Sequence, residues 1–122
     1  ICILKKKNII DALKLIKKEK KKLIFSAVKY SHPIQRSFFL KNNKIAMNFK
    51  KYLKKRTQDY SNSYHDAAQF YLGKSSTWNK TKTILSSNSC IVELKKNEIQ
   101  DIDDIQDWKL AEIIFKKTHK VN

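Results

Sequence analysis

The sequence contains very little glycine, proline and cysteine. Its 122 residues include one Gly, one Pro and two Cys. This shortage excludes loops built mainly from Gly and Pro, so the turns must be made by Asn, Ser, Asp and Lys. Cys2 and Cys90 stand alone, without a CxxC pair or a Cys/His spacing, which argues against a zinc site. Two isolated thiols suit a reducing cytoplasm.

The sequence also lacks a long apolar run. No stretch is long enough to span a bilayer and no secretory signal is recognisable, so we expect a cytoplasmic protein without a membrane partner. Hydrophobic residues still make up 41% of the chain and aromatic residues 11%. This content supports a packed core in one domain and argues against global disorder.

Acidic residues are scarce beside basic ones. Lys and Arg number 27 against 11 Asp and Glu, which gives a formal net charge of +16. Such a surplus fits either a polyanionic partner or a general lysine bias, and a small basic nucleic-acid-binding protein is therefore one candidate. Only Arg36 and Arg56 are arginine, and the lysines are spread along the chain. Because sequence-specific readers favour the planar fork of Arg, nucleic acid is the less favoured partner.

Apolar spacing predicts alternating helices and strands. We expect a helix after Asn8 as N-cap, with Asp11 in a capping-box position, and then a buried parallel strand at 23–28. With 1–4 as the end of an earlier strand, these elements form a βαβ unit. The remaining predicted elements are strand 67–72, a short helix capped by Ser75 or Ser76 and carrying Trp78, strands 90–94 and 99–103, and a helix at 105–117.

A hairpin is predicted in the middle of the chain. Residues 37–41 and 44–49 carry several apolar side chains and flank Asn42 and Asn43. Asn tolerates positive φ, so this pair can form a two-residue turn. A hairpin inserted into an α/β chain is a candidate extension or dimer arm.

Four aspartates lie close together before and within the last predicted helix. Asp104 is expected to be the N-cap of that helix and Asp107 its N3 residue. If 99–103 is a strand, Asp101 and Asp103 point to the same side, with their Cα atoms about 6–7 Å apart. Two carboxylates so placed suit Mg²⁺ shared with phosphate oxygens. The alternative is a solvated, Asp-rich turn.

Several stretches together resemble one enzyme family. They are SHPIQRSF at 31–38, RTQD at 56–59, YHDAAQFYLGK at 64–74 and QDIDDIQDW at 100–108, in that order. This order resembles the C-terminal half of the acylneuraminate cytidylyltransferases, and most of all the members that activate pseudaminic acid. Those members carry similar PIQR, TRSQD, YHDAGQFYWG and QDIDTPEDW stretches. The resemblance extends over most of the chain, from about Leu23 to Lys117.

The resemblance implies a reaction and a set of site residues. The family joins CTP and a nonulosonic acid into a CMP-sugar, releases pyrophosphate and uses Mg²⁺. Asp101 and Asp103 match the metal-binding aspartates of the family's DID motif and are the catalytic candidates. Arg56 matches the Arg of TRSQD and is the best candidate to hold the sugar carboxylate. The other implied substrate-binding residues are Gln35, Arg36, Gln58, His65, Asp66, Gln69 and Tyr71. Structural roles stay open for three of them: core packing for Tyr71, a turn for Asp66 and a hydrogen-bonded position for His65.

The resemblance also implies a fold and an assembly. We expect the C-terminal part of a Rossmann-like nucleotidyltransferase (nucleotide-diphospho-sugar transferase) fold, an α/β class. In it, 31–64 forms an extension whose β-hairpin is a homodimerisation arm, which would place Arg56 at the neighbouring subunit's site. Ala68 stands where the family has Gly, and Leu72 where it often has Trp. The family's N-terminal CTP-binding half has no counterpart in residues 1–122, so we expect a portion of a single domain that is inactive alone.

Three alternatives to this interpretation remain. The sugar could be N-acetylneuraminic or legionaminic acid. The chain could be a non-catalytic remnant that only dimerises. It could also be the small basic nucleic-acid-binding protein considered above, although its acidic and aromatic residues fall within the enzyme-like stretches.

Overall fold

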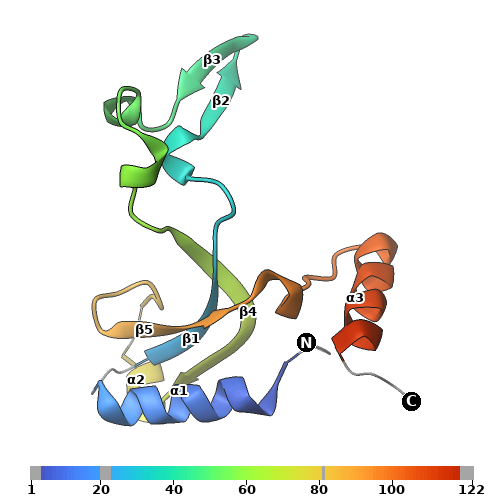
Figure 1. Cartoon of the computed structure of the whole chain (residues 1–122). Coiled ribbons are helices and arrows are strands. Elements are labelled where there is room, and N and C mark those ends of the chain that lie inside the picture. Colours follow the sequence, from blue (N-terminus) through green and yellow to red (C-terminus); the bar gives the residue numbers. More distant parts are fainter. Residues whose placement is uncertain (1–3, 20–22, 81, 119–122) are drawn as a thin grey trace. The chain divides into compact units, whose positions relative to one another are not determined.

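The computed structural model describes residues 4–19, 23–80 and 82–118 (Figure 1). The chain divides into two compact units, one formed by Ile1–Val28 with Asp66–Asn122 and the other by Lys29–His65. The helices and strands are, in chain order, α1 (Lys6–Lys18), β1 (Leu23–Lys29), β2 (Phe38–Lys41), β3 (Lys44–Met47), β4 (Tyr64–Gly73), α2 (Ser75–Trp78), β5 (Ser89–Leu94) and α3 (Ile105–Thr118). This is a mixed α/β chain, as the sequence predicts.

The first unit is built on a three-stranded sheet with the order β4-β1-β5. β1 and β5 are parallel, with a register that runs from Leu23 opposite Ser89 to Val28 opposite Leu94. β1 is buried at every position except the last. A continuous buried apolar run is typical of a central strand in a parallel sheet, and the strands predicted at 23–28, 67–72 and 90–94 are confirmed.

Strand β4 makes the sheet mixed. Two sets of hydrogen bonds give its direction. Tyr30, just after β1, donates a backbone hydrogen bond to Ser63, just before β4, whereas Ser26 within β1 accepts from the backbone N–H groups of Gln69 and Phe70 within β4. β4 is therefore antiparallel to β1, on the side away from β5.

Helix α1 supplies the packing partner for one face of the sheet. Ala12 lies in a buried cluster with Ile24 of β1 and with Val92 and Leu94 of β5. The small Ala side chain lets the helix approach the strands closely, and the large aliphatic side chains fill the space around it. Burying each of them contributes about 1.5–3 kcal/mol.

Two predicted helix caps are wrong. The residue before α1 is Lys5, which makes no side-chain capping bond, and Asn8 lies inside the first helical turns. Asn8 is 8% exposed, because it falls on the helix face that is turned inward rather than at the helix entrance. Helix α2 is preceded by Lys74, again without a side-chain cap, so neither Ser75 nor Ser76 has the predicted role.

The strand predicted at 99–103 is also absent. A 3₁₀ turn at Lys96–Glu98 follows β5, and residues 99–104 have no regular secondary structure. The apolar residues Ile99 and Ile102 are three positions apart, which does not fit the period of two that a half-buried strand requires. Asp101 and Asp103 therefore lose the strand geometry on which their predicted alignment depended.

The second unit contains the predicted hairpin. β2 and β3 are antiparallel, with Phe38 opposite Met47 and Lys41 opposite Lys44. Asn42 and Asn43 form the connection with φ of 50° and 59°, as expected for the pair. The role of this hairpin as a dimer arm stays a prediction. Within the part of the chain that the structure describes, no helix has the length and apolar character needed to cross a membrane.

Candidate functional site

The start of α3 is held by two aspartates that cap it reciprocally. Oδ1 of Asp104 accepts hydrogen bonds from the backbone N–H groups of Gln106 at 2.7 Å and Asp107 at 2.9 Å. Oδ2 of Asp107 accepts in return from the backbone N–H of Asp104 at 3.3 Å. This arrangement satisfies exposed amide donors at the helix start and places negative charge there, so the predicted capping roles are confirmed.

Asp101 and Asp103 lie in the irregular segment just before this cap, and both are exposed. Oδ1 of Asp101 accepts from the backbone N–H of Ile102 at 3.1 Å, and the backbone N–H of Asp103 donates to Asp107 at 3.2 Å. The carboxylate of Asp103 accepts no hydrogen bond from any described residue. Among those residues no group of three or more His, Cys, Asp or Glu could hold a metal ion. The metal-binding role of Asp101 and Asp103 stays a prediction.

Strand β4 bends at Ala68, which has a φ of 52°. Oδ1 of Asp66 accepts a hydrogen bond from the backbone N–H of Ala68 at 2.8 Å, closing a local Asx-type turn. Oδ2 of the same carboxylate accepts from the hydroxyl of Tyr71 at 2.5 Å. This bond, partial burial and the adjacent charge of Asp66 raise the pKa of Tyr71 to about 12. The structure therefore brings Asp66 and Tyr71, two predicted substrate-binding residues, into one hydrogen-bonded pair.

A buried hydroxyl in β1 supports the same bend. Ser26 is fully buried, and its Oγ accepts hydrogen bonds from the backbone N–H groups of Gln69 at 3.0 Å and Phe70 at 3.2 Å. It thus supplies an acceptor for the two backbone amides that follow Ala68. Sequence reasoning missed Ser26, although a polar residue inside the apolar run 23–28 was a visible signal.

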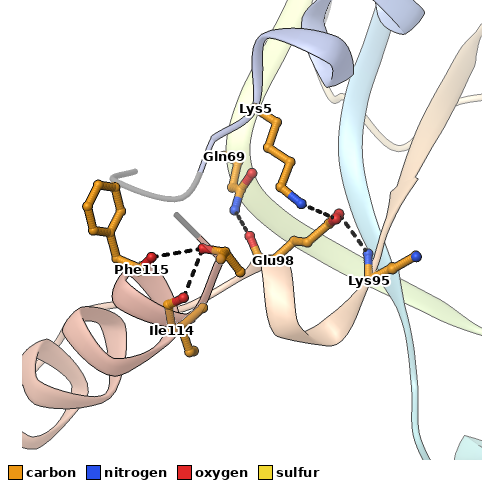
Figure 2. A network of polar contacts seen from close by, with 7 residues as sticks. Lys5, Gln69, Lys95, Glu98, Ile114 and Phe115 are labelled. Carbon is orange, nitrogen blue, oxygen red and sulfur yellow. Dashed lines mark hydrogen bonds and ion pairs between the residues drawn. The ribbon is translucent and has the colours of Figure 1, made fainter. Parts of the chain in front are cut away.

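Gln69 connects β4 to the segment that precedes the aspartates. Its Nε2 donates to the backbone carbonyl of Glu98 at 2.5 Å (Figure 2). The Glu98 carboxylate forms an ion pair with Lys5 at 2.7 Å and accepts a hydrogen bond from the backbone N–H of Lys95 at 3.3 Å. The Lys5 ammonium is the main cause that lowers the pKa of Glu98. Lys5 and Glu98 carry no motif, and the sequence gives no signal that they meet.

The remaining predicted site residues lie in the second unit. Gln58 lines a cavity of about 350 Å³ together with Lys29, His32 and Ser61. Gln35 is buried, and its Nε2 donates to the carbonyl of Ser61 at 3.3 Å, so it supports the wall of this cavity.

The other three predicted site residues of that unit, His65, Arg36 and Arg56, do not line the cavity. The ring of His65 packs on that of Tyr30, with 4.8 Å between their centroids. Arg36 and Arg56 are exposed. The predicted site is thus divided between the units: five residues belong to Lys29–His65, and Asp66, Gln69, Tyr71, Asp101 and Asp103 belong to the other.

Comparison with known proteins gives these residues a context. No protein-family model matches the chain. Two proteins of Campylobacter jejuni named pseudaminic acid cytidylyltransferase, from serotypes O:2 and O:23/36, are 40% and 39% identical to it over 100 residues. Each match covers 81% of this chain and 43% of the relative.

A third relative is a longer Helicobacter pylori protein. It is named pseudaminic acid cytidylyltransferase and UDP-2,4-diacetamido-2,4,6-trideoxy-beta-L-altropyranose hydrolase. It is 32% identical over 111 residues, which cover 90% of this chain and 21% of the relative. The chain thus spans less than half the length of each of these relatives. Over that length, it is homologous to the pseudaminic acid cytidylyltransferases.

Proposed function

We propose that the chain forms part of a cytidylyltransferase that transfers CMP from CTP to pseudaminic acid. The observation that carries this proposal is the 40% identity over 100 residues with a relative of that name. On this proposal the two units belong to a Rossmann-like nucleotidyltransferase fold with a CTP-binding half elsewhere. The enzyme acts in the cytoplasm, and the chain alone is inactive.

The proposed reaction sets chemical demands on the residues. The anomeric hydroxyl oxygen of the sugar attacks the α-phosphorus of CTP, the bond from that phosphorus to the bridging oxygen breaks, and pyrophosphate leaves while the hydroxyl loses its proton. The sugar carboxylate needs a cation, and Arg56 can hold it with two parallel hydrogen bonds. Gln35, Arg36, Gln58 and His65 are the proposed polar partners of the sugar.

Asp101 and Asp103 would hold Mg²⁺. Their carboxylate oxygens are hard donors, both side chains are exposed, and Mg²⁺ commonly takes only one or two carboxylates besides phosphate oxygens and water. The donor set therefore fits the ion. When bound, Mg²⁺ would neutralise charge on the triphosphate and the leaving pyrophosphate.

The β2–β3 hairpin is the proposed homodimerisation arm. Its apolar side chains are largely exposed: Phe38 at 55%, Phe39 at 51%, Leu40 at 66% and Ile45 at 68%. Side chains of this size are costly to leave in water, and a second subunit could cover them. An arm of this kind would carry Arg56 to the partner's active site.

The test is an assay of the chain joined to the part of a Campylobacter relative that lies outside the match. Supplied with CTP, Mg²⁺ and pseudaminic acid, the joined protein should form CMP-pseudaminic acid and pyrophosphate, and the chain alone should not. N-acetylneuraminic and legionaminic acids serve as competing substrates. A folded joined protein that forms no CMP-pseudaminic acid would refute pseudaminic acid as the substrate, and one that transfers CMP to none of the three sugars would refute the cytidylyltransferase activity.

The metal role has its own variant. Asp103→Asn should lower turnover on the order of 100-fold without unfolding the protein, because it removes a carboxylate from the metal. Glu112→Gln removes an exposed charge on α3 and is the matched control, expected to keep near-normal turnover. Equal turnover in both variants would show that Asp103 does not bind the catalytic metal.

A further inference from the structure

The segment that carries Asp101 and Asp103 is fixed at its two ends by side chains rather than by strand pairing. At the far end, Oδ1 of Asp107 accepts from Nε2 of Gln100 at 3.0 Å, and Oδ2 accepts from the backbone of Asp103. At the near end stands Glu98, three residues before Asp101. The two proposed metal ligands lie between these anchors, so their placement depends on both.

The near anchor joins three separate parts of the chain. Lys5, the residue before α1, bonds the Glu98 carboxylate across 93 positions of sequence, and Gln69 of β4 bonds the Glu98 carbonyl (Figure 2). The backbone of Lys95 binds the second carboxylate oxygen. We call this set, Lys5, Gln69, Lys95 and Glu98, the Glu98 brace. The Glu98 side chain is only 15% exposed, so its pairing with Lys5 is shielded from water more than a surface ion pair.

The Gln69 side chain is held by its hydrogen bond to Glu98. Its Nε2 is used by the Glu98 carbonyl, and its Oε1 is buried without a hydrogen-bond partner among the described residues. A buried unpaired amide oxygen is costly, and a side chain that turned outward toward a sugar would avoid that cost. The bond to Glu98 therefore directs the Gln69 side chain toward this segment.

We propose that Lys5, Gln69 and Glu98 are positioning residues that hold the Asp101–Asp103 segment in place for metal binding. This proposal rests on the proposed metal role of Asp101 and Asp103, and it reassigns Gln69 from sugar contact to support. Partners behind metal ligands typically change metal affinity 10- to 100-fold when removed, because they fix the ligands before the metal arrives.

The experiment uses the full chain and Mn²⁺ as a paramagnetic probe, without CTP or sugar. Mn²⁺ should broaden the amide NMR signals of residues 101–104 in the wild-type chain. Glu98→Gln and Gln69→Met should each need about tenfold more Mn²⁺ for the same broadening, and amides at 99–104 should exchange faster with solvent. Protection of the β1 and β5 amides reports that the sheet remains folded.

Matched variants separate the brace from general charge effects. Lys5→Met should behave like Glu98→Gln, whereas Lys5→Arg keeps the cation and should restore wild-type Mn²⁺ affinity. Glu112→Gln should leave the affinity unchanged. If the wild type binds Mn²⁺ at 101–104 and the folded Glu98→Gln and Gln69→Met variants bind it equally well, the brace has no positioning role and the proposal is wrong. If the wild type shows no broadening there, the two carboxylates do not bind the ion without nucleotide and the positioning proposal is wrong, whereas the metal role in the presence of CTP is tested separately by Asp103→Asn.

Discussion

Non-glycine residues take positive φ in two regions of the described chain, and the two regions solve the same steric problem differently. At the tip of the β2–β3 hairpin, Asn42 and Asn43 have φ of 50° and 59°. In the middle of β4, Ala68 has a φ of 52°. Asn tolerates this conformation, whereas Ala places its Cβ too close to the backbone, at a cost of roughly 1–2 kcal/mol.

The bend in β4 is stabilised by neighbouring side chains instead of by its own residue. Asp66 bonds the Ala68 backbone, Tyr71 bonds Asp66, and Ser26 of β1 takes the amides of the next two residues. The hairpin tip needs no such support, because its residue type already permits the turn. An irregular backbone can thus be specified by the residue that adopts it or by the residues around it.

The largest expected effect comes from removing the support under the bend. Ser26→Ala deletes the buried acceptor of the Gln69 and Phe70 amides and leaves two N–H groups without a partner. We expect the free energy of unfolding to fall by about 2–3 kcal/mol, as measured by urea denaturation. Ser76→Ala, at an exposed position in α2, should change it by less than about 0.5 kcal/mol. Equal effects of both substitutions would mean that the Ser26 hydroxyl does not stabilise the bend.

A smaller effect, of opposite sign, is expected at the bend itself. Ala68→Gly removes the strained Cβ but increases the freedom of the unfolded chain, so the net gain in unfolding free energy should be about 0.5–1 kcal/mol. Ala67→Gly is the control: Ala67 packs on the core and lacks positive φ, so Gly there should destabilise the protein. If Ala68→Gly is also destabilising, the strain at Ala68 is too small to matter.

This contrast explains which elements the sequence could predict. The Asn pair and the Asp104–Asp107 cap carry their signal in the residues that form the structure, and both predictions are confirmed. Asn8 carries the same capping signal, but burial against the sheet decides its place instead. The residue type of Ala68 gives no such signal, because its conformation is set by Ser26, Asp66 and Tyr71.

The candidate site shows the same division. The motif stretches name Asp101, Asp103 and residues of β4 as candidates from residue type and order alone, and their roles in a site stay predictions. The strand predicted at 99–103 was wrong, because the apolar pattern has a period of three and the segment is held by side-chain bonds to Asp107 instead of by strand pairing. Contacts such as Lys5 with Glu98 are fixed by packing across the whole unit, and no local pattern records them.

Raising the pH should weaken the support at the bend without any substitution. The pKa of Tyr71 is raised from 10.0 to about 12, chiefly by its hydrogen bond to Asp66. The folded state thus holds this proton more tightly than the unfolded chain, so the stabilisation is present below pH 10 and is lost as the pH rises toward 12. The difference in unfolding free energy between wild type and Tyr71→Phe should therefore shrink as the pH rises from about 10 to about 12. A constant difference would show that the phenol proton is not shared with Asp66 in solution.

The smallest effect is expected where the residue already suits its conformation. Asn43→Gly at the hairpin tip replaces one residue that tolerates positive φ by another, and Asn-Gly is the preferred pair for a two-residue turn. The relief of strain is small and is partly offset by the greater freedom of Gly in the unfolded chain, so the free energy of unfolding should change by only a few tenths of a kcal/mol. Asn43→Val, whose branched side chain is poorly suited to positive φ, should destabilise the hairpin clearly, as seen by faster amide exchange in β2 and β3. If Asn43→Gly raised the free energy of unfolding as much as Ala68→Gly, residue type would not distinguish the two regions. Both turns would then depend equally on the residues around them.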